Sequence, residues 1–129
     1  MIEAVTENLA IKQQLLGKIT PFLKPGVILT TNTSGLPVAG IAETLPAEFR
    51  RSWFGTHFFN PPRYMRLLEL IATPETDAAA VAAIAEFADR RLGKTVVYAN
   101  DTPNFIANRI GVYVMLQAID LMQQQGLTV

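Results

Sequence analysis

The sequence predicts an α/β fold, in which helices cover a parallel or mixed β-sheet and a long helix forms the C-terminus. Short β-branched or apolar runs alternate with stretches of helical periodicity, as they do in βαβ units. Polar turns follow several of these runs, and no internal repeat or low-complexity linker interrupts them. A chain of 129 residues suits one domain of this kind, with the long helix added at its end.

Strands and helices alternate in the first half of the chain. The segment 27–31 is β-branched and lies between a glycine and a polar cluster, which predicts a buried strand. Lys24-Pro25-Gly26 ends the helix before it. The predicted order is a strand or strand end at 2–5, a helix whose apolar face is Ile11, Leu15, Ile19 and Phe22, the strand 27–31, a short helix at 37–44, a charged surface connection at 45–51 and an aromatic strand at 53–59.

The second half continues the alternation. Thr73-Pro74-Glu75 combines a capping hydroxyl, a proline and an acid, which predicts the start of a helix that Gly93 ends. The other predicted elements are a strand at 67–71, a strand at 95–99, a polar turn at 100–104 and a helix at 105–125 that Gly126 ends.

The composition argues against several classes of function. Eleven basic residues balance eleven acidic ones, so charge favours neither nucleic acid nor an anionic membrane as a partner. The sequence has no cysteine and one histidine, so we expect no disulfide and no metal site. It has no apolar run long enough to cross a bilayer and no secretory signal, so we expect a cytoplasmic protein.

The helix 105–125 is apolar on most of its circumference, and such a helix needs cover on several sides. No later segment of the sequence supplies that cover, so we expect copies of the chain to associate through this helix. Its apolar residues are Ile110, Val112, Val114, Met115, Leu116, Ala118, Ile119, Leu121 and Met122.

Three polar segments each follow a predicted strand, at 32–34, 57–60 and 101–108. In open α/β sheets, ligands bind beyond the C-terminal ends of the strands. We therefore expect these segments to meet at one edge of the sheet and to form the site.

His57 is the only histidine, and histidine is the side chain that most readily exchanges a proton near neutral pH. By pattern it is either a core residue satisfied by a backbone carbonyl or a catalytic base. Glu69 lies in a run expected to be buried, where a carboxylate without a partner is costly. Its partner is Arg63, Arg66, solvent at an edge, or His57. In the last case Glu69 would fix the tautomer of the imidazole and leave its other nitrogen free to take a proton.

Other polar residues have simpler interpretations from pattern alone. Asn32 and Ser34 are residue types that satisfy turns. Asn108 reads as an exposed helix residue, and Glu7 and Lys12 read as surface residues of the first helix.

Five motifs, in order, resemble the 3-hydroxyacyl-CoA dehydrogenase family: EAVTENLAIKQ, TTNTSGLP, GTHFFNPPRYMRLLELI, LGKTVV and DTPNFIANRI. The most specific part is HFFNP followed by a glutamate in the next apolar run. The resemblance implies the latter part of an NAD-binding Rossmann-like domain at 1–103, followed at 104–129 by the first helix of a C-terminal dimerisation domain. It also implies oxidation of a 3-hydroxyacyl-CoA to the 3-ketoacyl-CoA with NAD, in fatty-acid β-oxidation.

The resemblance assigns roles by motif position. His57 would take the proton of the substrate hydroxyl, and Glu69 would hold and polarise His57. The residues implied to contact the substrate are Ser34, Asn60 and Asn108. The residues implied to line the nicotinamide half of the cofactor site are Glu7, Lys12, Asn32 and Ser34.

Two features depart from the family pattern. Many members have glycine where this chain has Asn104, which puts the backbone before Asn108 in question, because glycine tolerates a positive φ best and asparagine next. The family also begins with a strand, a G-x-G-x-x-G turn and a helix that hold the pyrophosphate, and this sequence has no such turn. We therefore expect an incomplete Rossmann-like domain, a piece of the enzyme that binds NAD poorly and is inactive alone.

Three alternatives stay open. The chain could be the central segment of a multifunctional hydratase/dehydrogenase, or part of a related hydroxy-acid or 3-hydroxybutyryl-CoA dehydrogenase. It could also be a non-catalytic piece that persists as an oligomerising or binding module. The choice of NAD over NADP rests on the resemblance alone.

Overall fold

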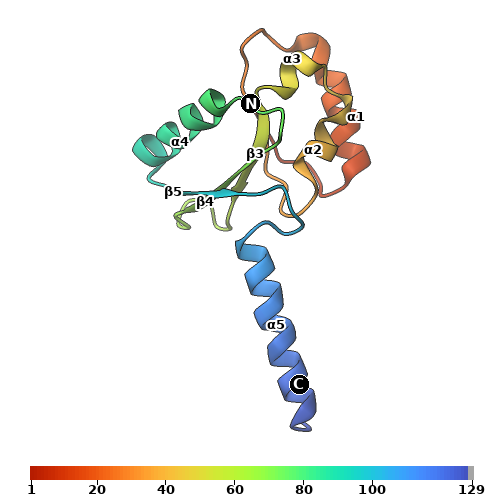
Figure 1. Ribbon diagram of the computed structural model, residues 1–129, viewed down its shortest axis with the longest axis vertical. Coiled ribbons are helices and arrows are strands. Elements are labelled where there is room, and N and C mark those ends of the chain that lie inside the picture. The colour runs from red at the N-terminus through yellow and green to blue at the C-terminus, as the bar shows by residue number, and fades with distance from the viewer. Residues whose placement is uncertain (128–129) are drawn as a thin grey trace.

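The computed structural model describes residues 1–127 and contains a five-stranded sheet, with helices on both faces, from which one long helix projects (Figure 1). The strands follow one another across the sheet in chain order: β1 (Ile2–Glu3), β2 (Leu29–Thr31), β3 (Trp53–Phe58), β4 (Leu67–Ala72) and β5 (Thr95–Ala99). The helices are α1 (Leu9–Ile19), η1 (Thr20–Phe22), α2 (Val38–Ile41), η2 (Ala42–Thr44), α3 (Ala47–Arg50), α4 (Ala78–Leu92) and α5 (Ala107–Gln124).

The sheet is mixed, which confirms the predicted fold class. Strands β1, β2 and β3 are parallel, β4 is antiparallel to β3, and β5 is parallel to β4. The chain therefore leaves β5 heading away from the C-terminal ends of β2 and β3. The expectation that three polar segments leave from one common edge is wrong for 101–108, which reaches the site by a different route.

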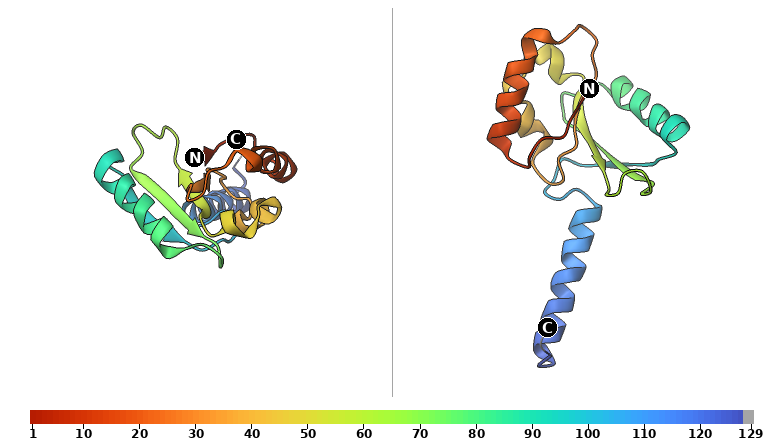
Figure 2. Two further views of the ribbon diagram at one scale, coloured as in Figure 1. Left: turned by 90° about the horizontal axis from the view of Figure 1, so that it is seen from above. Right: turned by 180° about the vertical axis from the view of Figure 1, so that it is seen from behind.

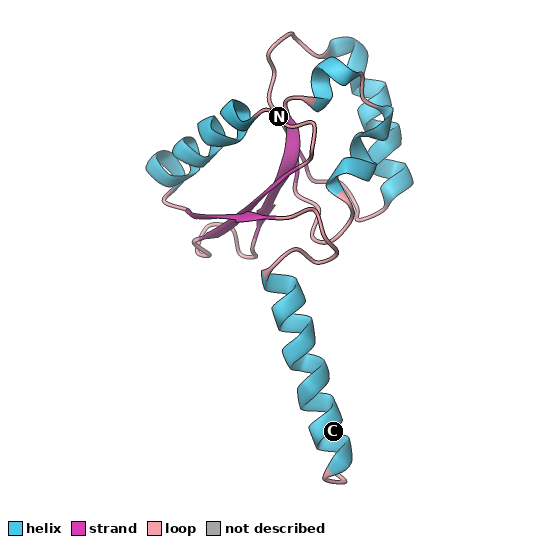
Figure 3. Cartoon of the chain, viewed as in Figure 1, coloured by secondary structure: helices cyan, strands magenta, loops and turns pink. Residues whose placement is uncertain are grey.

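Each face of the sheet carries its own apolar core. Helices α1 and α2 cover one face of the sheet and α4 covers the other (Figures 2 and 3). Successive side chains of a strand point to opposite faces, so Trp53 packs in the core with residues of α1 and α2, while Phe54 packs in the core with residues of α4. Strands β3 and β4 are buried on both faces, which explains why their sequences are almost continuously apolar.

Two predicted element boundaries are wrong. Helix α4 begins at Ala78, because Thr73 and Thr76 close a turn in which the Thr73 amide donates to the Thr76 hydroxyl at 2.8 Å. The predicted charged connection at 45–51 contains α3, and Leu45 is buried. Gly93, by contrast, ends α4 in the left-handed conformation with φ 63°, as expected of a C-terminal glycine.

The predicted apolar face of α1 is also wrong in part. Ile11 and Phe22 are 44% and 83% exposed, whereas Lys12 and Leu16 are buried. The pattern assumed that a lysine belongs in solvent. Lys12 lies inside because a buried carboxylate, that of Glu3, is its partner.

The predicted long C-terminal helix is present as α5, and none of its described side chains is buried. Residues 128–129 of the predicted segment 104–129 lie outside the described part of the chain, and the domain boundary at 103 stays a prediction. Within residues 1–127, no helix combines the length and hydropathy needed to cross a membrane.

Candidate functional site

His57 and Glu69 stand directly opposite each other in the antiparallel pairing of β3 with β4. Opposite residues of such a pair point to the same face with Cβ atoms about 5 Å apart, so the register itself brings the carboxylate to the imidazole. His57 Nδ1 lies 2.7 Å from Glu69 Oε2, and both side chains are buried. Of the predicted alternatives the partner of Glu69 is thus His57, while Arg63 and Arg66 are exposed.

The pair determines which nitrogen of His57 is available. In the neutral imidazole, Nδ1 carries the proton and donates it to the carboxylate, so Nε2 keeps its lone pair. Among residues 1–127 no group forms a hydrogen bond with Nε2. The ring centroids of Phe59 and Phe105 lie 4.4 Å and 5.6 Å from that of the imidazole, with tilted ring planes. The arrangement can accept a proton at Nε2.

The second oxygen of Glu69 contacts the start of α5. Oε1 accepts the backbone N–H of Ile106 at 3.2 Å and that of Ala107 at 2.8 Å. Both oxygens of this buried carboxylate therefore have partners, which removes most of the cost of burying it.

The segment 101–108 reaches the site by folding back along the sheet. Asp101 accepts the N–H groups of Val38 and Ala39 at the start of α2, each at 2.8 Å, which anchors the chain after β5. Asn108 then donates from Nδ2 to the carbonyl of Ser34 at 3.0 Å. The three polar segments therefore do meet, although the reason is this return and not a shared strand direction.

Asn104 stands where the family pattern has glycine. It adopts φ 64°, the conformation that glycine takes most easily and asparagine next. Its side chain also leaves no room for a side chain at position 35, because a Cβ on Gly35 would lie 2.7 Å from Asn104 Oδ1. The backbone before Asn108 therefore has a conformation that glycine would also adopt, and the role of Asn108 stays a prediction.

A buried charge cluster supports the loop before α1. Lys12 Nζ donates to Glu3 Oε1 at 2.9 Å, to Glu3 Oε2 at 3.1 Å and to the carbonyl of Val5 at 3.1 Å, and it lies 3.4 Å from Glu7 Oε2. Thr31, at the end of β2, donates its hydroxyl to Glu3 at 2.6 Å. Lys12 is buried and its ammonium is fully engaged, so the expectation of a surface lysine is wrong.

Glu7 connects this cluster to the loop that carries Ser34. It precedes α1, and its Oε1 accepts the Thr33 hydroxyl at 2.5 Å and the Ser34 amide at 2.7 Å. Partial burial would raise the pKa of the Glu7 carboxyl, but the hydrogen bonds from Thr33 and Ser34 and the charge of Lys12 outweigh burial and hold the pKa below its ordinary value.

The other predicted residues fall into two groups. Asn32 is engaged, because its Oδ1 accepts the Phe58 amide at 2.9 Å and ties the ends of β2 and β3 together. Ser34 and Asn60 are exposed at the ends of these strands, and their side chains are open to solvent.

Sequence reasoning missed Glu3 and Asp101. The signal for Glu3 was present: a carboxylate in a short apolar strand needs a partner, which is the argument that singled out Glu69. Nothing in the sequence connects Asp101 to the start of α2. Ala39, one of the residues whose amide it accepts there, lies 62 positions earlier in the chain.

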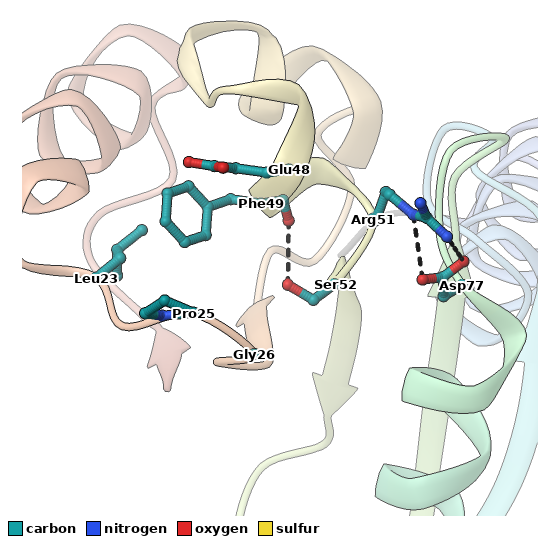
Figure 4. Close-up of a pocket in the computed structure, with 8 residues that line it drawn as sticks. All are labelled: Leu23, Pro25, Gly26, Glu48, Phe49, Arg51, Ser52 and Asp77. Atoms are coloured by element: carbon teal, nitrogen blue, oxygen red, sulfur yellow. Dashed lines mark hydrogen bonds and ion pairs between the residues drawn. The ribbon is translucent and has the colours of Figure 1, made fainter.

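A hollow of about 390 Å³ lies at the opposite end of the strands, before β2 and β3 begin (Figure 4). Leu23, Pro25 and Phe49 line it together with the Arg51–Asp77 ion pair of 3.1 Å. It contains none of the predicted site residues. Within residues 1–127 no cluster of side chains could hold a metal ion.

Comparisons with known proteins agree with this architecture. A family model described as "3-hydroxyacyl-CoA dehydrogenase, NAD binding domain" matches residues 1–102. A probable 3-hydroxyacyl-CoA dehydrogenase of Deinococcus radiodurans is 45% identical over 128 residues, which are 99% of this chain and 37% of that protein. A putative fatty acid oxidation complex trifunctional enzyme of Rickettsia felis is 46% identical over 115 residues, 89% of this chain and 16% of that protein.

A solved structure has the same fold. The crystal structure of Mycobacterium tuberculosis FadB2 superposes with a TM-score of 0.90 at 36% identity, and the match covers 99% of this chain and 45% of that chain. This chain therefore spans less than half the length of each of these three proteins.

Proposed function

The chain belongs to the 3-hydroxyacyl-CoA dehydrogenase family, and we propose that it forms the latter part of the NAD-binding domain of an enzyme that oxidises 3-hydroxyacyl-CoA to 3-ketoacyl-CoA in fatty-acid β-oxidation. The observation that carries the proposal is the buried His57–Glu69 pair at 2.7 Å. Glu69 keeps the proton on Nδ1, so Nε2 takes the proton of the substrate's 3-hydroxyl group. Because the oxygen gains negative charge as hydride leaves the carbon, a base directed at that oxygen lowers the barrier.

NAD, when bound, supplies the hydride acceptor. Glu7 and Ser34 are exposed beyond the ends of β1 and β2, and a carboxylate and a hydroxyl there suit the polar groups of the nicotinamide half. Lys12 has no free donor direction toward a ligand, so we assign it to the carboxylates of Glu3 and Glu7 and not to the cofactor. Asn32 likewise supports the site through Phe58.

The substrate side of the site is assigned to Ser34, Asn60 and Asn108. The hydroxyl of Ser34 is exposed and suits a hydrogen bond to the substrate oxygen. Asn108 uses Nδ2 for the carbonyl of Ser34, which leaves its amide oxygen for the substrate. Asn60 is exposed just after the end of β3, three residues after His57.

The test uses the full-length protein that contains this segment. With 3-hydroxybutyryl-CoA and NAD, and NADH absorbance as the readout, His57→Gln should lower kcat by roughly a hundredfold or more, the low end for loss of a general base. The exposed Arg66→Gln is the matched control and should retain kcat. Turnover of His57→Gln close to that of the unsubstituted protein would remove His57 from the role of base. An unsubstituted protein without turnover would favour the non-catalytic alternative.

Residues 1–129 alone should bind NAD weakly. The sequence has no G-x-G-x-x-G turn to hold the pyrophosphate, and that turn with its helix N-terminus is the main anion site of such domains. Calorimetric titration of this chain with NAD should show no saturation at micromolar concentration. A micromolar dissociation constant would contradict this expectation.

A second candidate is a multifunctional enzyme that contains this segment as its dehydrogenase part. The observation in its favour is the 46% identity to the Rickettsia felis trifunctional enzyme. The length of the complete open reading frame decides between the two, because a hydratase domain adds a second domain-sized segment. The cytoplasmic location stays a prediction.

We also propose that α5 associates with α5 of a second copy of this chain. Its exposed apolar side chains, from Ile110 to Leu121, have no cover among residues 1–127. Sedimentation at micromolar concentration should show a species larger than the monomer. Leu116→Glu should return it to a monomer, and the neighbouring Gln117→Glu should not. A monomeric unsubstituted chain would refute the association.

A further inference from the structure

Glu69 is shared between the base and the long helix. Oε2 lies 2.7 Å from His57 Nδ1, while Oε1 accepts the amides of Ile106 and Ala107 at 3.2 Å and 2.8 Å. Glu69 is 1% exposed, so water does not compete for either oxygen. One carboxylate thus joins β3, β4 and α5 at a single point.

The amides that Glu69 accepts are donors that α5 cannot satisfy by itself. The first N–H groups of any α-helix lack partners within the helix, and a side chain usually caps them. The residue at the N-cap of α5 is Ile106, which has no side-chain acceptor, and no local side chain caps this helix. Glu69 supplies the cap from β4, and the positive end of the helix favours a carboxylate in that place.

Helix α5 has few other attachments among residues 1–127. None of its own described residues is buried, and Phe105, just before it, is the apolar anchor. Asn108 adds one bond, to the carbonyl of Ser34 at 3.0 Å. The contacts that hold α5 on the sheet are therefore largely the contacts that form the site.

We propose that the first turn of α5 is a positioning element for the base: the amides of Ile106 and Ala107 hold Glu69 in the orientation that aims Oε2 at His57 Nδ1. With α5 docked, Nδ1 keeps the proton and Nε2 can accept one. When α5 moves off the sheet, Oε1 loses both donors, the carboxylate is free to rotate, and His57 can take the tautomer with the proton on Nε2. The proposal rests on the role proposed for His57 and adds that α5 controls it.

The chain itself provides the test, because His57 is its only histidine and the ¹⁵N signals of the imidazole report one residue. At a pH where the ring is neutral, the unsubstituted chain should show Nδ1 protonated and Nε2 unprotonated. Ala107→Pro removes one donor of Glu69 at the first position of the helix, where proline is best tolerated. It should move the tautomer ratio toward the Nε2–H form by roughly fivefold, the equivalent of one hydrogen bond.

Ala107→Gly is the matched control. It keeps the N–H and weakens the helix start, so the tautomer ratio should stay as in the unsubstituted chain. An unchanged ratio in Ala107→Pro, or an equal change in both variants, would overturn the proposal.

A second measurement does not depend on the proline variant folding. Glu69→Gln should accelerate hydrogen exchange at the amides of Ile106 and Ala107 by roughly tenfold, because a charged acceptor is replaced by a neutral one. Unchanged exchange at both amides would also overturn the proposal. These measurements need no substrate, so their failure would leave the kcat test of His57→Gln unaffected.

Discussion

The sheet and helix α5 are both rich in apolar residues, but the sheet is buried and the helix is exposed. Strands β3 and β4 are buried on both faces, whereas α5 has no buried residue and extends away from the sheet (Figure 1). Apolar residues on all sides indicate how much cover a segment needs. They do not indicate where that cover comes from. The apolar side chains of the sheet are covered by helices within residues 1–127, and those of α5 are not.

The two regions are joined by polar groups and one aromatic ring. Phe105 is buried next to His57, and Glu69 and the carbonyl of Ser34 hold the first turn of α5. A junction with few buried apolar contacts is expected to open at a lower free energy than a packed core. The candidate site lies at this junction, so the contrast between the two regions bears directly on the chemistry proposed for it.

The largest expected effect concerns the buried charges on the sheet side. Lys12→Met leaves the buried carboxylate of Glu3 without its cation, which should lower the free energy of unfolding by about 3–5 kcal/mol. Urea denaturation followed by the fluorescence of the single tryptophan, Trp53, measures it.

Two matched variants sharpen that result. Glu3→Gln combined with Lys12→Met removes both charges and should recover most of the lost stability, since no buried charge remains without a partner. Lys18→Met, on the exposed side of the same helix, should change the free energy of unfolding by less than about 0.5 kcal/mol. Equal effects of Lys12→Met and Lys18→Met would show that the buried pair of Lys12 with Glu3 does not contribute to the free energy of unfolding.

The next effect compares one isoleucine in each region. Ile71→Ala in β4 should cost about 2–5 kcal/mol, because Ile71 is fully buried and its loss opens a cavity. Ile119→Ala in α5 removes the same atoms from a side chain that is 41% exposed and should cost less than about 0.5 kcal/mol at concentrations where the chain is a monomer. A loss of 2 kcal/mol or more for Ile119→Ala under those conditions would mean that α5 has cover within one copy.

The smallest effect is the pH dependence that Glu7 contributes. Its pKa is lower in the folded chain than the ordinary value of 4.5, so its stabilising contribution is present above about pH 4.5 and is lost as the pH falls through the folded value. Because the side chain is 44% exposed and screened by solvent, the contribution should stay below about 1 kcal/mol. Glu7→Gln should therefore flatten the stability curve slightly between pH 5 and pH 3. A steeper acid loss in Glu7→Gln would contradict the sign.

Several features of the fold and the site could be predicted from local sequence. The βαβ alternation, the buried strand at 27–31, the glycine stop at Gly93 and the long C-terminal helix follow from periodicity and turn chemistry. His57 and Glu69 stood out because each was a titratable group within an apolar run. The start of α4 and the buried face of α1 could not be predicted, because contacts between separate elements decide them: the Thr76 hydroxyl donates to the Trp53 carbonyl, and Lys12 pairs with Glu3 of β1.

The sequence by itself determined the class of the fold, the family, and the residues in which a proton could be exchanged, since these depend on residue types and on spacing along the chain. Only the tertiary structure decided that β4 runs antiparallel to β3, which sets Glu69 opposite His57. It also decided that residues 101–108 return to the site and that Lys12 lies inside. The physical reason is the same in each case: a strand pairing, a buried ion pair and a helix cap each require two separate elements to meet, and local pattern describes one element at a time.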